Sequence, residues 1–388
     1  MNQKSLRRLA SLGAIAGALT GCAMAGGGPP LMPYPSGARL GTADSLRYDQ
    51  LVTIACHNCY APSAPGITHF TDALRYTTDL EVDIHARPRA PGDSTSPPAW
   101  DVRHGPGETN NCAGTTRRWW QLHRRGTGTA DLRQCLSAVA AWIDAHPTSP
   151  VLTLFVDLKD DGWDAGHTQA DLDALLVSVF GARLYRPADL SAGAGVARAA
   201  GNHAWRSLRG LRGMALVVLT GGEEPVAGCG YGMRKLRRAC QLVRGKLDRL
   251  EAGRNTVLAQ YVKARGDDAA AFVAPSVRSP EQVLGPVAAA SGRQRRAPKV
   301  AAPLDFEGLG EQVAFYNFYP EAAIVMGKLS LLDGMGAAAR KRGVVVRLWV
   351  EPEYREESRP TFCAAARAGI QRVASHYFRT ERICLPGQ

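Results

Sequence analysis

The chain has 388 residues, of which 45% are hydrophobic, 21% charged and 7% aromatic. This balance supports a large buried core and excludes a disordered chain, a collagen-like fibre and a small disulfide-stabilised domain. The formal net charge of +12 favours anionic partners such as phosphates, lipid headgroups or nucleic acid, without choosing between them.

The first residues have the pattern of a secretory signal. Three basic residues and no acidic one precede a short apolar run at residues 9–20, which is well short of the roughly 20 residues that span a bilayer. The small residues before Cys22 resemble a bacterial lipobox, which implies cleavage before Cys22 and attachment of lipid to it. An ordinary signal peptide cut near Ala25 is the alternative.

The signal sets the expected domain organisation. We expect residues 1–21 to be removed, residues 22–47 to form a flexible tether and residues 48–388 to fold as one domain. The mature protein is then exported and lipid-anchored to a bacterial membrane, at the outer membrane or cell surface, in the periplasm or outside the cell.

Short apolar, β-branched runs alternate with helix-like stretches along the domain. Strands are predicted at residues 51–55, 80–84, 151–158, 214–219, 344–350 and 369–374, and helices at 131–145, 169–180 and 331–342. A further strand is expected near 271–274 or 313–318, and the sequence does not choose between them. Near-continuous apolar strands are typical of a parallel sheet covered by helices, and their number favours an α/β fold of the (β/α)8 barrel type over a six-stranded open sheet.

Polar side chains lie where strands should terminate in four segments, residues 54–58, 80–83, 101–104 and 156–159. They are His57 and Asn58, then Glu81 and Asp83, then His104, and finally Asp157 and Lys159. Because successive side chains of a strand alternate between its faces, Glu81 and Asp83 share one face, and so do Asp157 and Lys159. In a barrel that face is the interior, and groups near the carboxyl ends of the strands line its mouth.

Three carboxylates at one barrel mouth repel each other unless a cation compensates them. The four candidate ligands all offer oxygen atoms: Asn58, Glu81, Asp83 and Asp157. Such a set suits Ca²⁺, or alternatively Mg²⁺, better than Zn²⁺. His57 and His104 remain for proton transfer, and a cation with an acid and a base suffices for phosphodiester cleavage. His85, two residues after Asp83, is the alternative to His104 if the strand continues that far.

Nine cysteines in an exported chain point to disulfides. Pairing of nearest neighbours, with Cys22 set aside, gives Cys112–Cys135, Cys229–Cys240 and Cys363–Cys384. Cys56 and Cys59 flank His57 and Asn58, and their spacing fits a strained disulfide, a redox pair or two free thiols.

Three stretches resemble known phospholipases. Residues 54–60 (IACHNCY) resemble the "HNSY" opening of phosphatidylinositol-specific phospholipase C catalytic domains, and residues 80–83 (LEVD) look like their "ELD" strand. Residues 111–160 are similar to the bacterial calcium-dependent phosphoinositide-specific phospholipase C family, in which an "NC…DCL…W…HP…ELKD" pattern follows the second histidine. Cys59 stands where that family usually has Ser, and Asp157 where it usually has Glu.

The resemblance implies a distorted TIM barrel and assigns roles to individual residues. It implies His57 and His104 as the catalytic histidines, Asn58, Glu81, Asp83 and Asp157 as Ca²⁺ ligands, and Lys159 as a phosphate-binding group. The implied reaction is attack on phosphorus by a ring hydroxyl next to the phosphate, which gives a cyclic inositol phosphate and releases diacylglycerol.

The expected partner is a phospholipid at a membrane surface, with no nucleic acid partner, and the protein is expected to be a monomer. Two alternatives stay open. One is a glycerophosphodiester phosphodiesterase or phospholipase D-like enzyme of the same barrel superfamily. The other is a catalytically inactive surface lipoprotein that binds a ligand.

Overall fold

The computed structural model describes a set of ranges that all belong to one compact unit, Leu31–Gln388. They are residues 43–61, 67–89, 96–112, 130–160, 163–221, 255–277, 309–318, 330–349 and 363–375. The predicted signal segment and Cys22 lie outside these ranges, and so do Cys229, Cys240 and Cys384. No helix within the described ranges has the length and apolar character needed to cross a bilayer.

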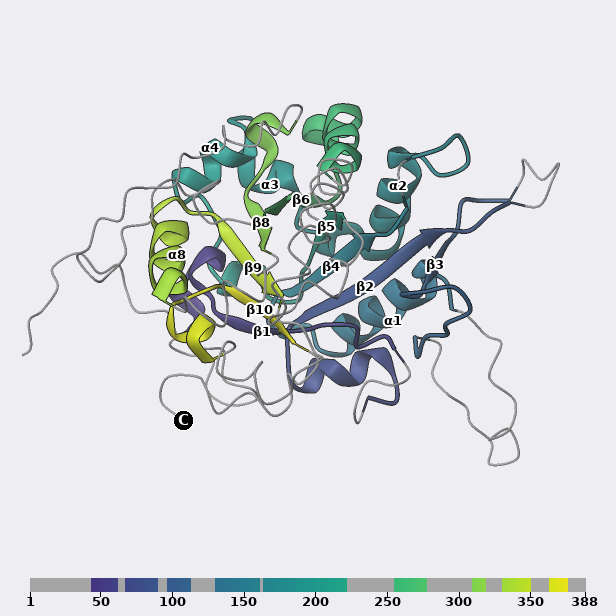
Figure 1. Cartoon of the computed structure of the whole chain (residues 1–388), viewed down its shortest axis with the longest axis horizontal. Coiled ribbons are helices and arrows are strands. Elements are labelled where there is room, and N and C mark those ends of the chain that lie inside the picture. Colours follow the sequence, from purple (N-terminus) through teal and green to yellow (C-terminus); the bar gives the residue numbers. More distant parts are fainter. Residues whose placement is uncertain are drawn as a thin grey trace, which may run out of the picture. The chain divides into compact units, whose positions relative to one another are not determined.

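The domain is built on a ring of parallel strands. They are β1 (Thr53–Cys56), β2 (Asp79–Ala86), β4 (Leu152–Leu158), β5 (Ala215–Gly221), β6 (Phe272–Ala274), β7 (Ser276–Val277), β8 (Phe315–Phe318), β9 (Val345–Trp349) and β10 (Arg372–Ser375). Their order in the sheet is β6-β5-β4-β2-β1-β10-β9-β8-β7. The first strand of the domain thus pairs in parallel with the last, and β1 and β10 lie side by side in Figure 1.

The two ends of this strand order meet on one segment of chain. β6 pairs with β5 and β7 pairs with β8, while Pro275 alone separates β6 from β7. Proline has no N–H to give to a sheet, which explains the interruption. With β6 and β7 taken together as one strand, eight parallel strands close into a barrel, and a bridge between Val273 and Val313 reinforces the closure. The predicted TIM-type barrel is confirmed, and both segments between which the sequence did not choose are strands.

One strand stands outside the barrel. β3 (Trp100–Val102) pairs antiparallel with the far end of β2, where Ile84 faces Val102 and Ala86 faces Trp100. The segment that leads to His104 is therefore an appendix to β2 and not a barrel strand of its own. Its alternating residues had suggested an ordinary strand end, because sequence periodicity carries no information on which strand is the partner.

Helices cover the outside of the barrel. The α-helices are α1 (Leu132–Ala145), α2 (Gln169–Phe180), α3 (Pro187–Ser191), α4 (Val196–Gly201) and α8 (Ser330–Lys341). Residues 255–265 and 363–367 are also helical. The short 3-10 turns are η1 (Ala43–Ser45), η2 (Tyr48–Gln50), η3 (Phe70–Arg75), η5 (Gly181–Arg183), η6 (Arg209–Leu211), η8 (Gly266–Asp268) and η9 (Gly310–Gln312).

α1 shows how the sequence sets these elements. Its start is fixed by a capping box, in which the Asp131 side chain accepts from the N–H of Gln134 and the Gln134 side chain accepts from the N–H of Asp131, both at 2.9 Å. Its apolar residues recur at helical spacing and are buried against the barrel.

The barrel interior carries a ladder of ion pairs along β2. Asp79, Glu81 and Asp83 are successive inward residues of that strand, and all three are buried. Each meets a basic side chain from another strand or strand end: Arg372 Nε at 3.0 Å from Asp79, Arg347 Nη2 at 2.7 Å from Glu81, and Lys159 Nζ at 3.2 Å from Asp83. Each of the three buried carboxylates of β2 therefore has a basic partner.

Two disulfides have both partners within the described ranges. Cys112–Cys135 confirms the nearest-neighbour pairing, with Cα atoms 4.8 Å apart. Cys56 and Cys59 are also bonded to each other, which excludes two free thiols and leaves a structural disulfide or a redox pair. Cys363 is in a disulfide as well.

Candidate active site

The turn after β1 presents His57 and Asn58 to the barrel. The N–H of His57 donates to the carbonyl of Ser375 at 3.2 Å, which holds the turn against β10. Asn58 has a φ of 54°, a left-handed conformation that asparagine tolerates better than most residues. The Cys56–Cys59 disulfide closes the turn around these two residues, and both side chains are buried.

His57 faces the middle carboxylate of the β2 ladder. Its Nε2 lies 3.5 Å from Oε2 of Glu81, while Oε1 of Glu81 is paired with Arg347. Burial, together with the charges of Asp83 and Asp157, raises the pKa of Glu81 to about 7 against the opposing charges of Arg347 and Lys159. Glu81 is thus a carboxyl group that changes charge near neutral pH.

Asp83, one inward position further along β2, binds the second histidine. Nδ1 of His104 lies 2.7 Å from Oδ2 of Asp83. Burial by itself raises the pKa of Asp83, but the Lys159 ammonium and the hydrogen bond from His104 outweigh it and hold the pKa below its ordinary value. Asp83 is therefore ionised, orients the His104 ring through Nδ1 and leaves Nε2 as the outward nitrogen.

Lys159 joins the carboxylates of two neighbouring strands. Asp83 and Asp157 are register partners in the β2–β4 pair, and Nζ of Lys159 lies 3.2 Å from Asp83 and 2.8 Å from Asp157. The other oxygen of Asp157 accepts from the Thr220 hydroxyl of β5 at 2.7 Å. In this structure the group predicted to bind phosphate thus neutralises two of the predicted metal ligands.

The structure brings the sequence-predicted site residues other than Cys22 to one end of the barrel, with His104 reaching Asp83 from the loop after β3. Two further residues belong to this site and were not predicted. Arg347 crosses from β9 to Glu81, and its guanidinium also stacks on Phe155, 4.7 Å from the ring centre, and donates to Asn317 at 3.0 Å. Thr220 orients Asp157. A charged residue inside an apolar strand, as in the VVRLW segment of β9, is the sequence signal that could have indicated Arg347.

His85 does not replace His104 at the carboxylate cluster. β2 continues through His85, as the alternative required, but the His85 ring contacts Asp160 and the backbone carbonyl of His104. The histidine that contacts Asp83 is His104.

The donor chemistry of the four predicted ligands fits a hard cation, with one condition. Oδ1 of Asn58 and Oε2 of Glu81 are buried and have no hydrogen-bond partner among the described residues, although Oε2 faces Nε2 of His57, and such oxygen atoms suit a cation. Asp83 and Asp157 both hold Lys159, and within the described ranges no three His, Cys, Asp or Glu side chains are arranged to hold a metal ion. A divalent cation shared by all four residues therefore requires Lys159 to leave the two aspartates.

The fold is that of bacterial phospholipases C specific for phosphoinositides. A calcium-dependent phosphoinositol-specific phospholipase C from Pseudomonas sp., described as a myoinositol complex, is 24% identical over 87% of this chain and 92% of that chain, with a TM-score of 0.57. Another crystal form of the Pseudomonas enzyme has a TM-score of 0.58 at 24% identity, over 90% of this chain and 95% of that one. A Ca²⁺-dependent phosphatidylinositol-specific enzyme from Streptomyces antibioticus is 20% identical over 87% and 97% of the two chains, with a TM-score of 0.54.

At identities of 20 to 24% the similarity establishes the shared barrel fold, and the chemistry has to be inferred from the site residues. No protein-family model matches the chain, and no curated protein sequence matches it significantly.

Proposed function

We propose that this chain is a phosphodiesterase that cleaves phosphatidylinositol-type phospholipids to a cyclic inositol phosphate and diacylglycerol. The observation that carries the proposal is the pair of imidazoles held against neighbouring inward carboxylates of β2, His57 at Glu81 and His104 at Asp83. Two residues along a strand span about 6.6 Å, so both rings can reach one phosphodiester group. The solved proteins of the same fold act on phosphoinositides according to their descriptions, which supports this substrate class.

The surroundings of each histidine suggest its part in the reaction. The ionised Asp83 stabilises the imidazolium form of His104, which suits it to protonate the leaving glycerol oxygen. His57 is the complementary base, which takes the proton of the inositol hydroxyl as that hydroxyl attacks phosphorus. Lys159 supplies a positive charge for the phosphate oxygens once it turns from the aspartates.

Ca²⁺, or alternatively Mg²⁺, is the proposed cofactor, and Asn58, Glu81, Asp83 and Asp157 would hold it. When bound, such an ion lowers the pKa of the attacking hydroxyl and stabilises negative charge on the phosphate.

Anchoring through a lipid on Cys22 would keep the barrel at a phospholipid surface. Loss of the protein from the membrane fraction in a Cys22→Ser variant is the expected result, and unchanged fractionation would contradict the anchor.

A panel of phosphodiester lipids tests the function. The wild-type protein is expected to release cyclic inositol phosphate from phosphatidylinositol, and His57→Ala and His104→Ala are each expected to lower kcat by at least 100-fold, since each removes one partner of the proton transfer. His146→Ala is the control, because His146 is an exposed residue at the end of α1. Release of glycerol 3-phosphate or ceramide phosphate would favour the related phosphodiesterases, and binding without turnover would favour an inactive lipoprotein.

Replacement of Lys159 by methionine tests the cation site. In EDTA, Lys159→Met leaves Asp83 and Asp157 facing each other without their shared ammonium, so we expect a stability loss of about 3 kcal/mol. Added Ca²⁺ no longer competes with Lys159 in this variant and is expected to raise Tm more than in the wild type. Equal Ca²⁺-induced shifts in both proteins, measured by calorimetry, would show that the cation does not bind at these aspartates.

A further inference from the structure

A second acid and histidine pair, which the proposed reaction leaves unused, lies beside the site. Asp160 follows the end of β4, and His85 is the penultimate residue of β2. Nδ1 of His85 is 3.1 Å from Oδ1 of Asp160, and the other carboxylate oxygen of Asp160 accepts from the N–H of Ala86. Hydrogen bonds from His85 and Ala86 hold the pKa of Asp160 below its ordinary value against the opposing effect of burial. Asp160 is thus a fixed anion that orients the His85 ring.

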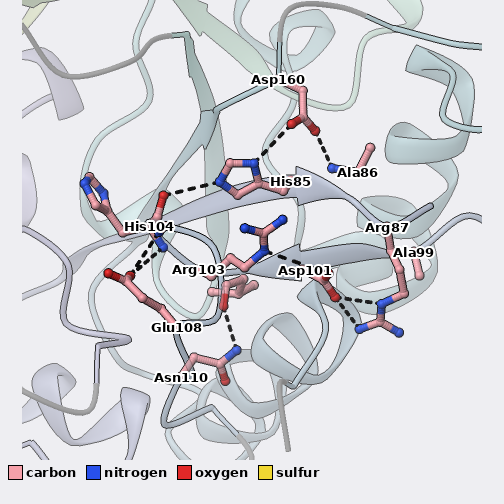
Figure 2. Close-up of polar contacts among 12 residues, drawn as sticks. His85, Ala86, Arg87, Ala99, Asp101, Arg103, His104, Glu108, Asn110 and Asp160 are labelled. Carbon is pink, nitrogen blue, oxygen red and sulfur yellow. Dashed lines mark hydrogen bonds and ion pairs between the residues drawn. The ribbon is translucent and has the colours of Figure 1, made fainter. Parts of the chain in front are cut away.

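The far side of that ring touches the backbone of the proposed catalytic acid. Nε2 of His85 lies 3.4 Å from the carbonyl oxygen of His104. The His104 carbonyl and the ionised Asp160 carboxylate both only accept, so His85 makes the two hydrogen bonds together when both of its ring nitrogens carry a proton. Figure 2 shows the resulting chain, which runs from Asp160 through His85 to the His104 backbone.

The amide side of His104 is held as well. Oε2 of Glu108 accepts from the N–H of His104 at 3.2 Å and from the N–H of Gly105 at 3.0 Å (Figure 2). The preceding residue, Arg103, donates its N–H to the carbonyl of Asp83 at 3.1 Å. Both peptide groups of His104 therefore have side-chain partners, in addition to the bond between its own ring and Asp83.

These contacts matter because His104 does not sit on the barrel frame. It follows the antiparallel appendix β3 and enters a loop, Gly105-Pro106-Gly107, in which Gly107 has a φ of 77°. Its side chain is 34% exposed. A loop residue without further support is a poor position for an acid that must meet a leaving oxygen within a few tenths of an ångström.

We propose that Asp160 and His85 form a positioning pair that fixes the backbone of His104, and with it the placement of the His104 ring for the proposed phosphodiesterase reaction. The pair is built from the ends of two barrel strands, β2 and β4, so it transfers the rigidity of the barrel to the loop. The proposal rests on the proposed function for its kinetic consequence, but not for the contact itself.

The kinetic test compares truncation with conservative replacement. His85→Ala is expected to lower kcat for phosphatidylinositol between 10- and 100-fold with KM within about twofold, because a misplaced acid affects the chemical step. His85→Gln retains an amide N–H that can reach the His104 carbonyl and is expected to recover at least half of the lost activity on a logarithmic scale. Asp160→Ala is expected to resemble His85→Ala, and the double alanine variant is expected to be no worse than either single variant.

A spectroscopic test does not depend on turnover. In NMR spectra of ¹⁵N-labelled protein, the ring signals of His104 report its hydrogen bond to Asp83. His85→Ala is expected to shift or broaden these signals. His85→Gln is expected to restore them, and the control His146→Ala is expected to leave them unchanged. If the wild-type protein does not hydrolyse lipids, the proposed function is refuted, but this NMR test still decides whether the positioning pair holds His104. Unchanged His104 signals and kcat in His85→Ala, or equal loss in a folded His85→Gln, would overturn the positioning pair. If His85→Ala fails to fold, His85→Gln and Asp160→Asn provide the same comparison.

Discussion

Glu81 and Asp83, two residues apart on β2, differ in charge state because each meets different neighbours. Asp83 is kept ionised by Lys159 and His104, whereas the pKa of Glu81 is raised to about 7 because burial outweighs its pairing with Arg347. Residue type alone does not distinguish these two acids. One acid thus orients a histidine, and the other changes charge near neutral pH.

The raised pKa of Glu81 predicts how stability depends on pH. Between about pH 4.5 and 7 the unfolded chain has lost the Glu81 proton while the folded protein still holds it, so the contribution of this residue to the free energy of unfolding falls as pH rises. From pH 4.5 to 8 the loss amounts to about 3 kcal/mol in the absence of divalent cations. The Glu81→Gln variant has no proton to lose at this position and is expected to lack this pH-dependent loss of stability.

Urea unfolding of the wild type and of Glu81→Gln, at pH 5 and pH 8 in EDTA, measures this effect. The difference between the two proteins is expected to move by about 2 to 3 kcal/mol in favour of the variant on going to pH 8. Glu311→Gln, on an exposed side chain, is the control. A difference that does not change with pH would contradict the raised pKa.

At the scale of elements, the described residues between β3 and α1, 103–112 and 130–131, are held at several points. The Asn110 amide donates to the carbonyls of Val102 and Ala130, both at 2.8 Å. Cys112 is bonded to Cys135, which lies in the first turn of α1. These links join the end of the His104 loop to a helix that is packed on the barrel.

Removal of the Cys112–Cys135 bond is expected to weaken this fastening. The two cysteines are 23 positions apart, and the chain-entropy model gives a loop of that size about 3 kcal/mol of stability. The Cys112→Ser, Cys135→Ser double variant is therefore expected to unfold at lower urea concentration. A double variant as stable as the oxidised wild type would refute this.

At the scale of the whole molecule, the two ends of the barrel have different roles. The site lies at the carboxyl ends of the strands, as in other TIM barrels, while Asp79 and Arg372 form a buried pair at the opposite end of β2. Arg372 also covers the Tyr48 ring at 4.5 Å and donates to the carbonyl of Gln371 at 2.9 Å. This end of the barrel serves stability.

A double-mutant cycle on Asp79 and Arg372 tests that division. Arg372→Met leaves Asp79 as an unpaired buried charge and is expected to cost about 3 to 5 kcal/mol, whereas adding Asp79→Asn removes that charge and is expected to restore at least 1 kcal/mol. Because the pair lies away from the histidines, the kcat of the folded variants is expected to stay within threefold of wild type. Strict additivity, or a large loss of kcat at full stability, would contradict the assignment.

Much of the fold could be predicted because strand and helix patterns are local. The strands around Leu80, Leu154 and Val217 have apolar runs that need burial on both faces, and α1 has its own capping box, so these elements follow from neighbouring residues. The spacing of Glu81 and Asp83 likewise fixed their common face. These features do not depend on which segments of chain meet.

Features that depend on distant segments could not be predicted in this way. The pairing of β3 with β2, the reach of Arg347 across the barrel to Glu81, and the contact of His85 with the His104 carbonyl each join residues from separate segments. The sequence suggested a cation for the carboxylates, but only the packed barrel showed that Lys159 and Arg347 already pair with them. Local sequence thus determined the elements and the candidate residues, whereas partners and charge states were decided by tertiary structure, because Coulomb interactions and desolvation depend on distance and burial in space.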